Sequence, residues 1–249
     1  MADAPVQLAP GVHRLGHPLV NCYLLEEDGR LTLVDAGLAG FRGQLEGYLR
    51  TLGRGLGDIE AVVLTHAHSD HVGMADGVRR DAGARVLVHA GDAEMARTAK
   101  PHKREASMLP YLRNGATWRL FGTFARYGGI KPQKIAEVTT FAAGDDVLDV
   151  PGRPRVIPTP GHSPGHVAFH LPDRGVLFAG DALCTYNALT GARGPQLLPS
   201  AFAFSNAQLL TSLDVLEPLH ADLVLFGHGE PWTGGAGAAV TRARELGFT

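Results

Sequence analysis

The sequence predicts an α/β fold in a single domain that spans residues 1–249. Short apolar runs bounded by turn residues predict strands, and apolar residues at helical spacing predict helices between them. Strands and helices mix without strict alternation, which argues against a simple doubly wound sheet. With 249 residues, of which 45% are hydrophobic, the chain is long enough to bury a substantial core.

The first hundred residues are expected to begin with three short strands. The turn Glu26–Gly29 joins the second and third of them, and Asp35-Ala36-Gly37 ends the third. A buried strand then runs directly into a histidine-rich segment. The expected strands are Val12–Leu15, Cys22–Leu25, Leu31–Val34, Ala61–Leu64 and Arg85–His89; the expected helices begin at Phe41, at about Asp70 (to Asp81) and at Asp92 (to Ala99).

Residues 100–131, here called the insert, differ in composition from the rest of the chain. They hold seven of the 23 Lys and Arg residues and one acid, Glu105, and they also carry five aromatic residues. Apolar spacing predicts two amphipathic helices, one through Met108 and Leu112 and one through Trp118 and Phe121. We interpret the insert as a helical insertion, either a lid over a site or a dimer contact.

Residues 147–249 are expected to return to strands, with two further helices. Asn206 is expected to cap the first of these helices, whose apolar face includes Leu209 and Leu213. The expected strands are Val147–Val150, Arg155–Pro158, His166–Leu171, Val176–Ala179 and Leu223–Phe226; the last helix spans about Gly237–Leu246.

Composition excludes several functional classes. The net charge of −2 and pI of about 6.6 give no global nucleic-acid footprint. No apolar run reaches membrane-spanning length, and residues 1–10 lack the features of a signal peptide. Two cysteines, Cys22 and Cys184, cannot form a disulfide framework and favour free thiols in a reducing compartment. We therefore expect a cytoplasmic protein that binds a small molecule rather than nucleic acid or a membrane.

Four possible metal ligands lie within six residues after the strand Ala61–Leu64. They are His66, His68, Asp70 and His71. Zn²⁺ binds imidazole nitrogen and carboxylate oxygen, and the adjacent Asp70 and His71 point in different directions. The motif can therefore serve two metals. His162, Asp181 and His228 each follow a predicted strand and lie beside glycine, so they are candidates for the remaining ligands.

These seven residues resemble the signature of the metallo-β-lactamase superfamily: His-x-His-x-Asp-His, then a distant His, Asp and His in that order. The resemblance extends from about Val12 to Pro231 and lies nearest the glyoxalase II-like and lactonase-like branches. It implies a four-layer αβ/βα sandwich in which two mixed sheets face each other with helices outside. It also implies that His66, His68 and His162 hold one metal, that Asp70, His71 and His228 hold the other, and that Asp181 bridges them. Asp35 is expected to be structural, bonding backbone around the site.

The mechanism implied is hydrolysis of an ester, thioester or lactone with two Zn²⁺ per chain, although such ligands also accept iron or manganese. The metals generate hydroxide from a shared water, and it attacks the carbonyl carbon. Asp70 is the expected catalytic residue, orienting the nucleophile and passing its proton to the leaving group. Two alternatives remain: a mononuclear iron oxygenase that resembles persulfide dioxygenases, and a metal-loaded binding protein without turnover.

The sequence indicates substrate-binding residues less specifically than it indicates metal ligands. β-Lactamases of this fold have Cys or Ser where Asp181 stands, so antibiotic hydrolysis would be at most a side activity. Related lactonases have Tyr three residues after the bridging Asp, where this chain has Cys184, and Tyr186 follows two residues later. We take Cys184, Tyr186, Trp118 and Phe121 as candidate substrate-binding residues, although aromatics at helical spacing are more often core. The basic insert suggests a substrate with an anionic group.

Overall fold

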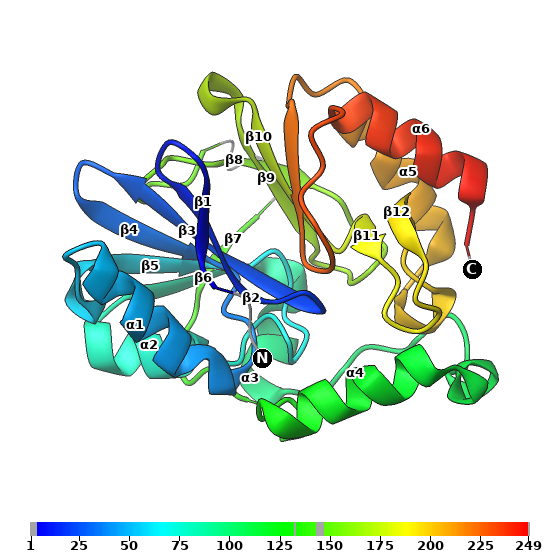
Figure 1. Cartoon of the computed structure of the whole chain (residues 1–249), viewed down its shortest axis with the longest axis horizontal. Helices are drawn as coiled ribbons and strands as arrows, with labels where there is room; N and C mark the ends of the chain where they lie inside the picture. The colour runs from blue at the N-terminus through cyan, green and yellow to red at the C-terminus, as the bar shows by residue number, and fades with distance from the viewer. Residues whose placement is uncertain (1–3, 132, 143–146, 249) are drawn as a thin grey trace.

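The computed structural model describes residues 4–131, 133–142 and 147–248. Two sheets face each other, with helices on their outer faces (Figure 1). This arrangement confirms the predicted four-layer sandwich. No helix in these described ranges is long and apolar enough to cross a membrane.

The first sheet has seven strands in chain order. Its strands β1 to β4 pair antiparallel, whereas β4 to β7 pair parallel. The strands are β1 (Val6–Ala9), β2 (Val12–His17), β3 (Val20–Glu27), β4 (Arg30–Val34), β5 (Ile59–Val63), β6 (Arg85–His89) and β7 (Thr139–Phe141).

The second sheet has the order β13-β10-β9-β8. Because β9 runs antiparallel to β8 and β10, and β13 runs parallel to β10, three strands point the same way and end at one edge. Its strands are β8 (Arg155–Pro158), β9 (Val167–Leu171), β10 (Val176–Gly180) and β13 (Leu223–Phe226); a separate hairpin contains β11 (Cys184–Tyr186) and β12 (Arg193–Gln196).

The central strands of the two sheets, such as β5 and β10, are largely buried on both faces, and their alternation divides the core into layers. Ala61 and Val63 face the second sheet, whereas Val62 between them faces the helices of the first half. Likewise, Val176 and Phe178 point between the sheets, and Leu177 packs against the helices of the second half. Period-two alternation therefore supplies an inter-sheet core and two outer cores from the same strands.

Helices cover each sheet from outside, as Figure 1 shows. Those over the first sheet come from the first half of the chain, and those over the second sheet come from the second half. They are α1 (Arg42–Thr51), α2 (Ala75–Ala82) and α3 (Ala93–Thr98) on the first sheet, and α5 (Asn206–Leu216) and α6 (Ala236–Leu246) on the second.

The insert contains one α-helix, α4 (Gly115–Arg126), drawn in green along the lower edge of both halves in Figure 1. The other expected helix is a 3₁₀ segment, Leu109–Arg113. Pro110 lies at its start, and five residues form too short a segment for a stable α-helix. The insert is tied to the first half by the Gly40 N–H, which donates to Tyr127 O at 2.9 Å. It is tied to the second half by Thr117 Oγ1, 3.1 Å from Leu189 O.

Three other predictions about elements were wrong. The expected strand Val147–Val150 is only an isolated bridge from Val147 to Arg155, because Pro151 and Pro154 flank a tight turn there. Helix α2 begins at Ala75 rather than Asp70, since the metal-binding motif occupies a loop.

The cap of α5 also differs from the prediction. The capping side chain is Ser205, whose Oγ accepts from the Gln208 N–H at 3.3 Å, and Asn206 is the first helical residue. The sequence analysis did not anticipate strands β1, β7, β11 and β12.

Candidate metal centre

The seven predicted ligands lie at carboxyl ends of strands. The four motif residues follow β5, whereas His162, Asp181 and His228 follow β8, β10 and β13. These ends meet because backbone bonds join the two sheets there: the Val167 N–H donates to Thr65 O and the Asn21 N–H donates to Gly227 O, both at 2.8 Å. The fold therefore brings together residues from both halves of the chain.

The ligand atoms form three overlapping groups, each with its atoms within 4.8 Å of one another. His68 Nδ1 lies 2.7 Å from His162 Nε2, with His66 in the same group. Asp70 Oδ2 lies 3.5 Å from His228 Nε2 and 3.8 Å from His71 Nε2. Two of the three groups, His66/His68/His162 and Asp70/His71/His228, contain the residues of the two ligand sets expected from the sequence.

Asp181 lies between these two sets and contacts both. Its Oδ2 is 3.0 Å from His228 Nε2 and 3.3 Å from His162 Nε2, and its Oδ1 is 3.6 Å from His71 Nε2. Its carboxylate is 2% exposed. A carboxylate in this position can contribute one oxygen to each of two cations.

Asp35 orients the rings of two histidines, that of His71 directly and that of His66 through Thr65. Its Oδ2 lies 2.8 Å from His71 Nδ1, which leaves His71 Nε2 facing the cluster. The Thr65 N–H and hydroxyl both donate to Asp35 at 2.8 Å, and Thr65 Oγ1 lies 3.0 Å from His66 Nδ1. Asp35 thus bonds backbone around the site, as expected, and also fixes ring orientations, as carboxylates behind metal-bound histidines do.

Asp92 is a supporting residue that the sequence analysis did not identify. It is fully buried and accepts from the Ala67 N–H at 3.0 Å, the Ser163 hydroxyl at 2.7 Å and the Gly165 N–H at 2.8 Å. Ala67 lies between two motif histidines, and Ser163 follows His162. One carboxylate therefore holds two ligand-bearing loops in register.

His166, expected not to be a ligand, supports Asp181 instead. Its Nε2 accepts from the Asp181 N–H at 2.9 Å, so its Nδ1 carries the proton that is donated to Thr159 Oγ1 at 2.8 Å. Burial lowers the pKa of His166 to about 4, which keeps it neutral for this role. His228 is oriented in a similar way, because its Nδ1 is bonded to Leu19 O.

Gly227 is required by close approach rather than by backbone conformation. A Cβ at this position would lie 2.1 Å from Asp181 Oδ1 and 2.6 Å from His71 Cε1. The glycine before His228 thus allows the end of β13 to pass against the cluster.

The environment of the cluster shifts the pKa values of its histidines in opposite directions. Burial lowers the pKa of His66 well below its usual value, and His71 and His162 lower it further. Burial would also lower the pKa of His71, but Asp181, Asp35 and Asp70 together raise it to about 10. For Asp181, burial is outweighed by His228 and the other neighbouring histidines, which hold its pKa well below the usual range. Because metal ligation requires neutral imidazole, cations compete with protons at His71.

The donor set fits divalent cations. His66 Nε2, His71 Nε2 and Asp181 Oδ1 are buried and have no hydrogen-bond partner within the described part of the chain. Buried polar atoms normally have hydrogen-bond partners, so three such atoms without one at the same cluster fit a role as metal ligands. Ligand atoms around one tetrahedral Zn²⁺ lie about 3.3 Å apart, close to the separations found here.

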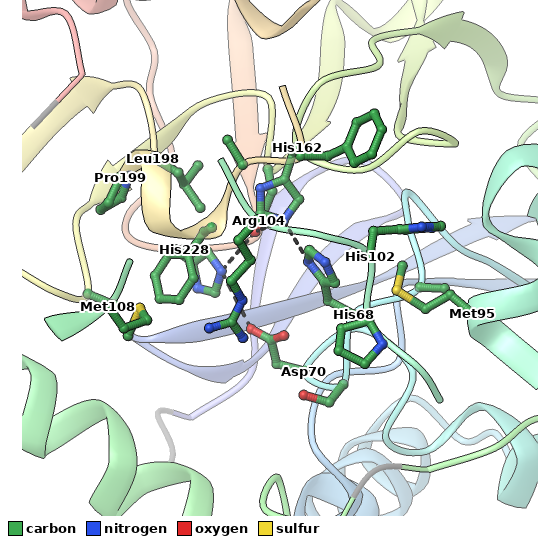
Figure 2. A pocket seen from close by; sticks show the side chains of 18 of the residues that line it. His68, Asp70, Met95, His102, Arg104, Met108, His162, Leu198, Pro199 and His228 are labelled. Carbon is green, nitrogen blue, oxygen red and sulfur yellow. Dashed lines mark hydrogen bonds and ion pairs between the residues drawn. The ribbon is translucent and has the colours of Figure 1, made fainter. Parts of the chain in front are cut away.

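A cavity of about 530 Å³ opens beside the cluster, and its lining includes His68, Asp70, His162, Asp181 and His228. Of the predicted substrate-binding residues, Phe121 lines it (the cavity is shown in Figure 2). Cys184, Tyr186 and Trp118 do not: Cys184 and Tyr186 are buried in the fold, and Trp118 is 60% exposed with its Nε1–H bonded to Leu112 O.

Sequence comparison links the chain to bacterial metallo-hydrolases. It is 28% identical over 249 aligned residues to the Bacillus subtilis "Probable metallo-hydrolase YflN", covering 94% of this chain and 89% of the relative. It is 31% identical to B. subtilis YobT over 66% of this chain and 61% of that protein. A hydroxyacylglutathione hydrolase of Cereibacter sphaeroides is 34% identical, but over 50% of this chain and 34% of the enzyme. The chain thus covers less than two thirds of two of these three relatives.

Solved structures have the same fold. A metallo-β-lactamase family protein from Thermus thermophilus superposes with a TM-score of 0.68 at 32% identity, over 96% of this chain and 79% of the other. A metallo-β-lactamase from Cronobacter sakazakii gives 0.70 at 21% identity, over 98% and 92%, which shows the fold alone. A family model described as "Metallo-beta-lactamase superfamily" matches residues 15–228. The chain therefore belongs to the metallo-β-lactamase superfamily.

Proposed function

We propose that this protein is a metal-dependent hydrolase with two Zn²⁺ per chain, and that it cleaves an ester, thioester or lactone. The observation that carries this proposal is the position of Asp181, whose carboxylate contacts both the His66/His68/His162 set and the Asp70/His71/His228 set. A site for one cation would not need a second complete set of donors around the same carboxylate.

The bound cations would lower the pKa of a shared water and polarise the carbonyl of the substrate. Within the chain, Asp70 is positioned for proton transfer, because it lines the cavity and its Oδ2 lies 3.5 Å from His228 Nε2. It orients the attacking water and carries its proton to the leaving group. Asp35 and Asp92 hold the surrounding rings and loops, so the donors need little rearrangement during the reaction.

The thioester is the bond favoured by the relatives, since one of them is named a hydroxyacylglutathione hydrolase. The match covers only about a third of that enzyme, so it supports the type of bond and not the glutathione group. Esters and lactones have the same electrophilic carbonyl and belong in the same assay panel.

The proposal is tested first by metal analysis of untagged protein expressed without metal supplementation. We expect about two zinc ions per chain by elemental mass spectrometry. About one iron per chain would contradict the dinuclear site and favour the oxygenase alternative, which oxygen consumption with persulfides then tests.

Turnover is tested with thioester, aryl-ester and lactone panels. We expect Asp70→Ala to abolish hydrolysis while the circular dichroism spectrum remains that of the wild type. A zinc-loaded protein that hydrolyses none of the three bonds would contradict the proposal and favour a binding protein without turnover.

A further inference from the structure

The cavity beside the metal centre has walls of two different chemical kinds. Its volume of about 530 Å³ is typical of small-molecule sites. One end is formed by the histidine and aspartate cluster. Much of the remainder is formed by the insert together with residues 198–204, two segments that contribute none of the predicted ligands.

Most of the cavity wall is apolar. Side chains from α3, from the insert and from the loop before α5 surround the space. They include Met95, Met108, Phe121, Phe124, Leu198 and Phe202. Methionine and phenylalanine side chains accommodate alkyl groups of variable shape, because methionine is flexible and polarisable. This wall suits an apolar acyl group better than a sugar or a nucleotide.

Two cationic side chains lie among these apolar ones. Lys103 and Arg104 line the cavity, and Figure 2 shows the Arg104 side chain extending across it in front of Asp70 and His228. Within the described residues, neither cation forms an ion pair, whereas many arginines elsewhere in the fold do. Among the residues that the structure describes, the acids in the lining are Asp70 and Asp181, and both belong to the metal cluster.

The backbone that carries these cations is anchored on both sides. On one side, His102 Nε2 lies 3.7 Å from Asp92 Oδ1, and its ring packs against Phe204. On the other side, the Glu105 N–H donates to Ala203 O at 2.7 Å. The carboxylate of Glu105 accepts from the Asn206 N–H at 3.3 Å, so this acid has a partner other than the two cations. Lys103 and Arg104 are thus held at the cavity, and neither is in an ion pair with a described residue.

We infer that the substrate is an amphiphilic anion: an ester or thioester with an apolar acyl group and a carboxylate or similar oxyanion that binds Lys103 and Arg104. This inference rests on the proposed function for the scissile bond. Its evidence, however, is the composition of the cavity wall, so binding can be measured separately from turnover.

The test uses the zinc-loaded protein and a non-hydrolysable probe, 1-octanesulfonate, with binding measured by calorimetry. We expect octanesulfonate to bind more tightly than 1-octanol, which has the same chain without the charge. Affinity should rise from butane- to octanesulfonate by up to about fourfold per buried methylene. The preference for the anion should weaken as ionic strength rises, because both cations are exposed.

Charge-neutralising variants locate the anion. Arg104→Gln and Lys103→Gln should each raise the Kd of octanesulfonate by about three- to tenfold, leaving the Kd of octanol within twofold. Arg119→Gln, which makes the same change in charge on the insert but outside the cavity, is the matched control and should leave both values unchanged. Phe121→Ala should reduce the dependence on chain length while keeping the preference for the anion.

Competition connects the probe to the metal site. Octanesulfonate should inhibit hydrolysis of the neutral ester 4-nitrophenyl butyrate competitively, with a higher inhibition constant in Arg104→Gln. The inference is overturned if the Lys103/Arg104 double variant binds octanesulfonate as tightly as the wild type, or if butanesulfonate binds as tightly as octanesulfonate. If 4-nitrophenyl butyrate is not hydrolysed but binding follows charge and chain length, the hydrolase proposal fails and the amphiphile site stands.

Discussion

The ligand-bearing loops and the insert border the same cavity, but they are built differently. The loops are largely buried, and the rings of His66, His71 and His228 are fixed by a hydroxyl, a carboxylate and a carbonyl, respectively. The insert leaves large apolar side chains in solvent, with Leu109 73% and Trp118 60% exposed. It is held by a few polar contacts with each half. The strand framework therefore carries the predicted ligands, whereas the insert supplies part of the cavity wall beside them.

The largest effect should follow from removing the charge of Asp181, which contacts both ligand sets. Asp181→Asn keeps the shape of the side chain but removes the charge that contacts both metal sets. We expect loss of at least one metal ion per chain and a fall in kcat/KM on the order of 10³-fold, since metal catalysis contributes several kcal/mol. Elemental analysis and steady-state kinetics measure both. Asp173→Asn, an exposed carboxylate beyond β9, is the control; two metals and nearly full activity in Asp181→Asn would contradict the assigned bridge.

A smaller effect should follow from weakening the hydrogen bonds by which Asp92 holds two loops together. In Asp92→Asn, one of the two oxygens becomes an amide nitrogen facing hydrogen-bond donors, so the loops around Ala67 and Ser163 lose part of their shared anchor. We expect metal affinity to fall about 10- to 100-fold, as for other supporting residues behind metal ligands. Competition with a chelator measures this. If Asp92→Asn lowers only the melting temperature and leaves metal affinity unchanged, Asp92 supports the fold and not the site.

A substitution where the insert is attached to the second half should affect the metal centre less than a substitution in the ligand-bearing loops. Thr117→Val removes a buried hydroxyl that lies 2.8 Å from Tyr111 O and 3.1 Å from Leu189 O. We expect a loss of about 1 kcal/mol in the free energy of unfolding. Cleavage of the insert by protease should also be faster, with metal affinity within twofold of the wild type. Urea denaturation and limited proteolysis measure these effects, and a large fall in metal affinity would show that the two regions are not separable.

Substitutions on the exposed face of the insert should have the smallest effect on stability. Leu109→Ser is expected to change the free energy of unfolding by less than about 0.5 kcal/mol, because this side chain is largely in solvent. Sedimentation of the wild type and the variant tests the alternative that the insert is a homodimer contact. A dimer that dissociates in Leu109→Ser would assign this face to association.

The ligand-bearing loops were predicted from the sequence better than the insert was. The reason is that the strands before these loops have local sequence signals, whereas other features depend on contacts between distant segments. β6 was predicted at its observed limits, and β5, β10 and β13 to within two residues, because continuous apolar runs bounded by glycine are local signals. The seven ligand candidates follow such strands or turns in a recognisable order. Their convergence requires only that the carboxyl ends of the strands meet.

What the sequence could not predict depends on contacts between distant segments. Asp92 bonds Ala67 and Ser163, which lie 25 and 71 residues away, and its own surroundings resemble an ordinary helix start. Cys184 and Tyr186 follow Asp181 closely, but the strand β11 that contains them packs into the fold rather than along the cavity. Sequence spacing gave no indication of that direction.

The division of the ligands between the two sheets also determines when the metal centre can form during synthesis. The motif after β5 emerges from the ribosome early, but His228 follows β13, which is the last strand and pairs with β10 across a long separation in the chain. Such non-local pairing is a late step in folding. A nascent chain that has not yet completed β13 lacks His228, so the group Asp70, His71 and His228 can assemble only after this strand has been made.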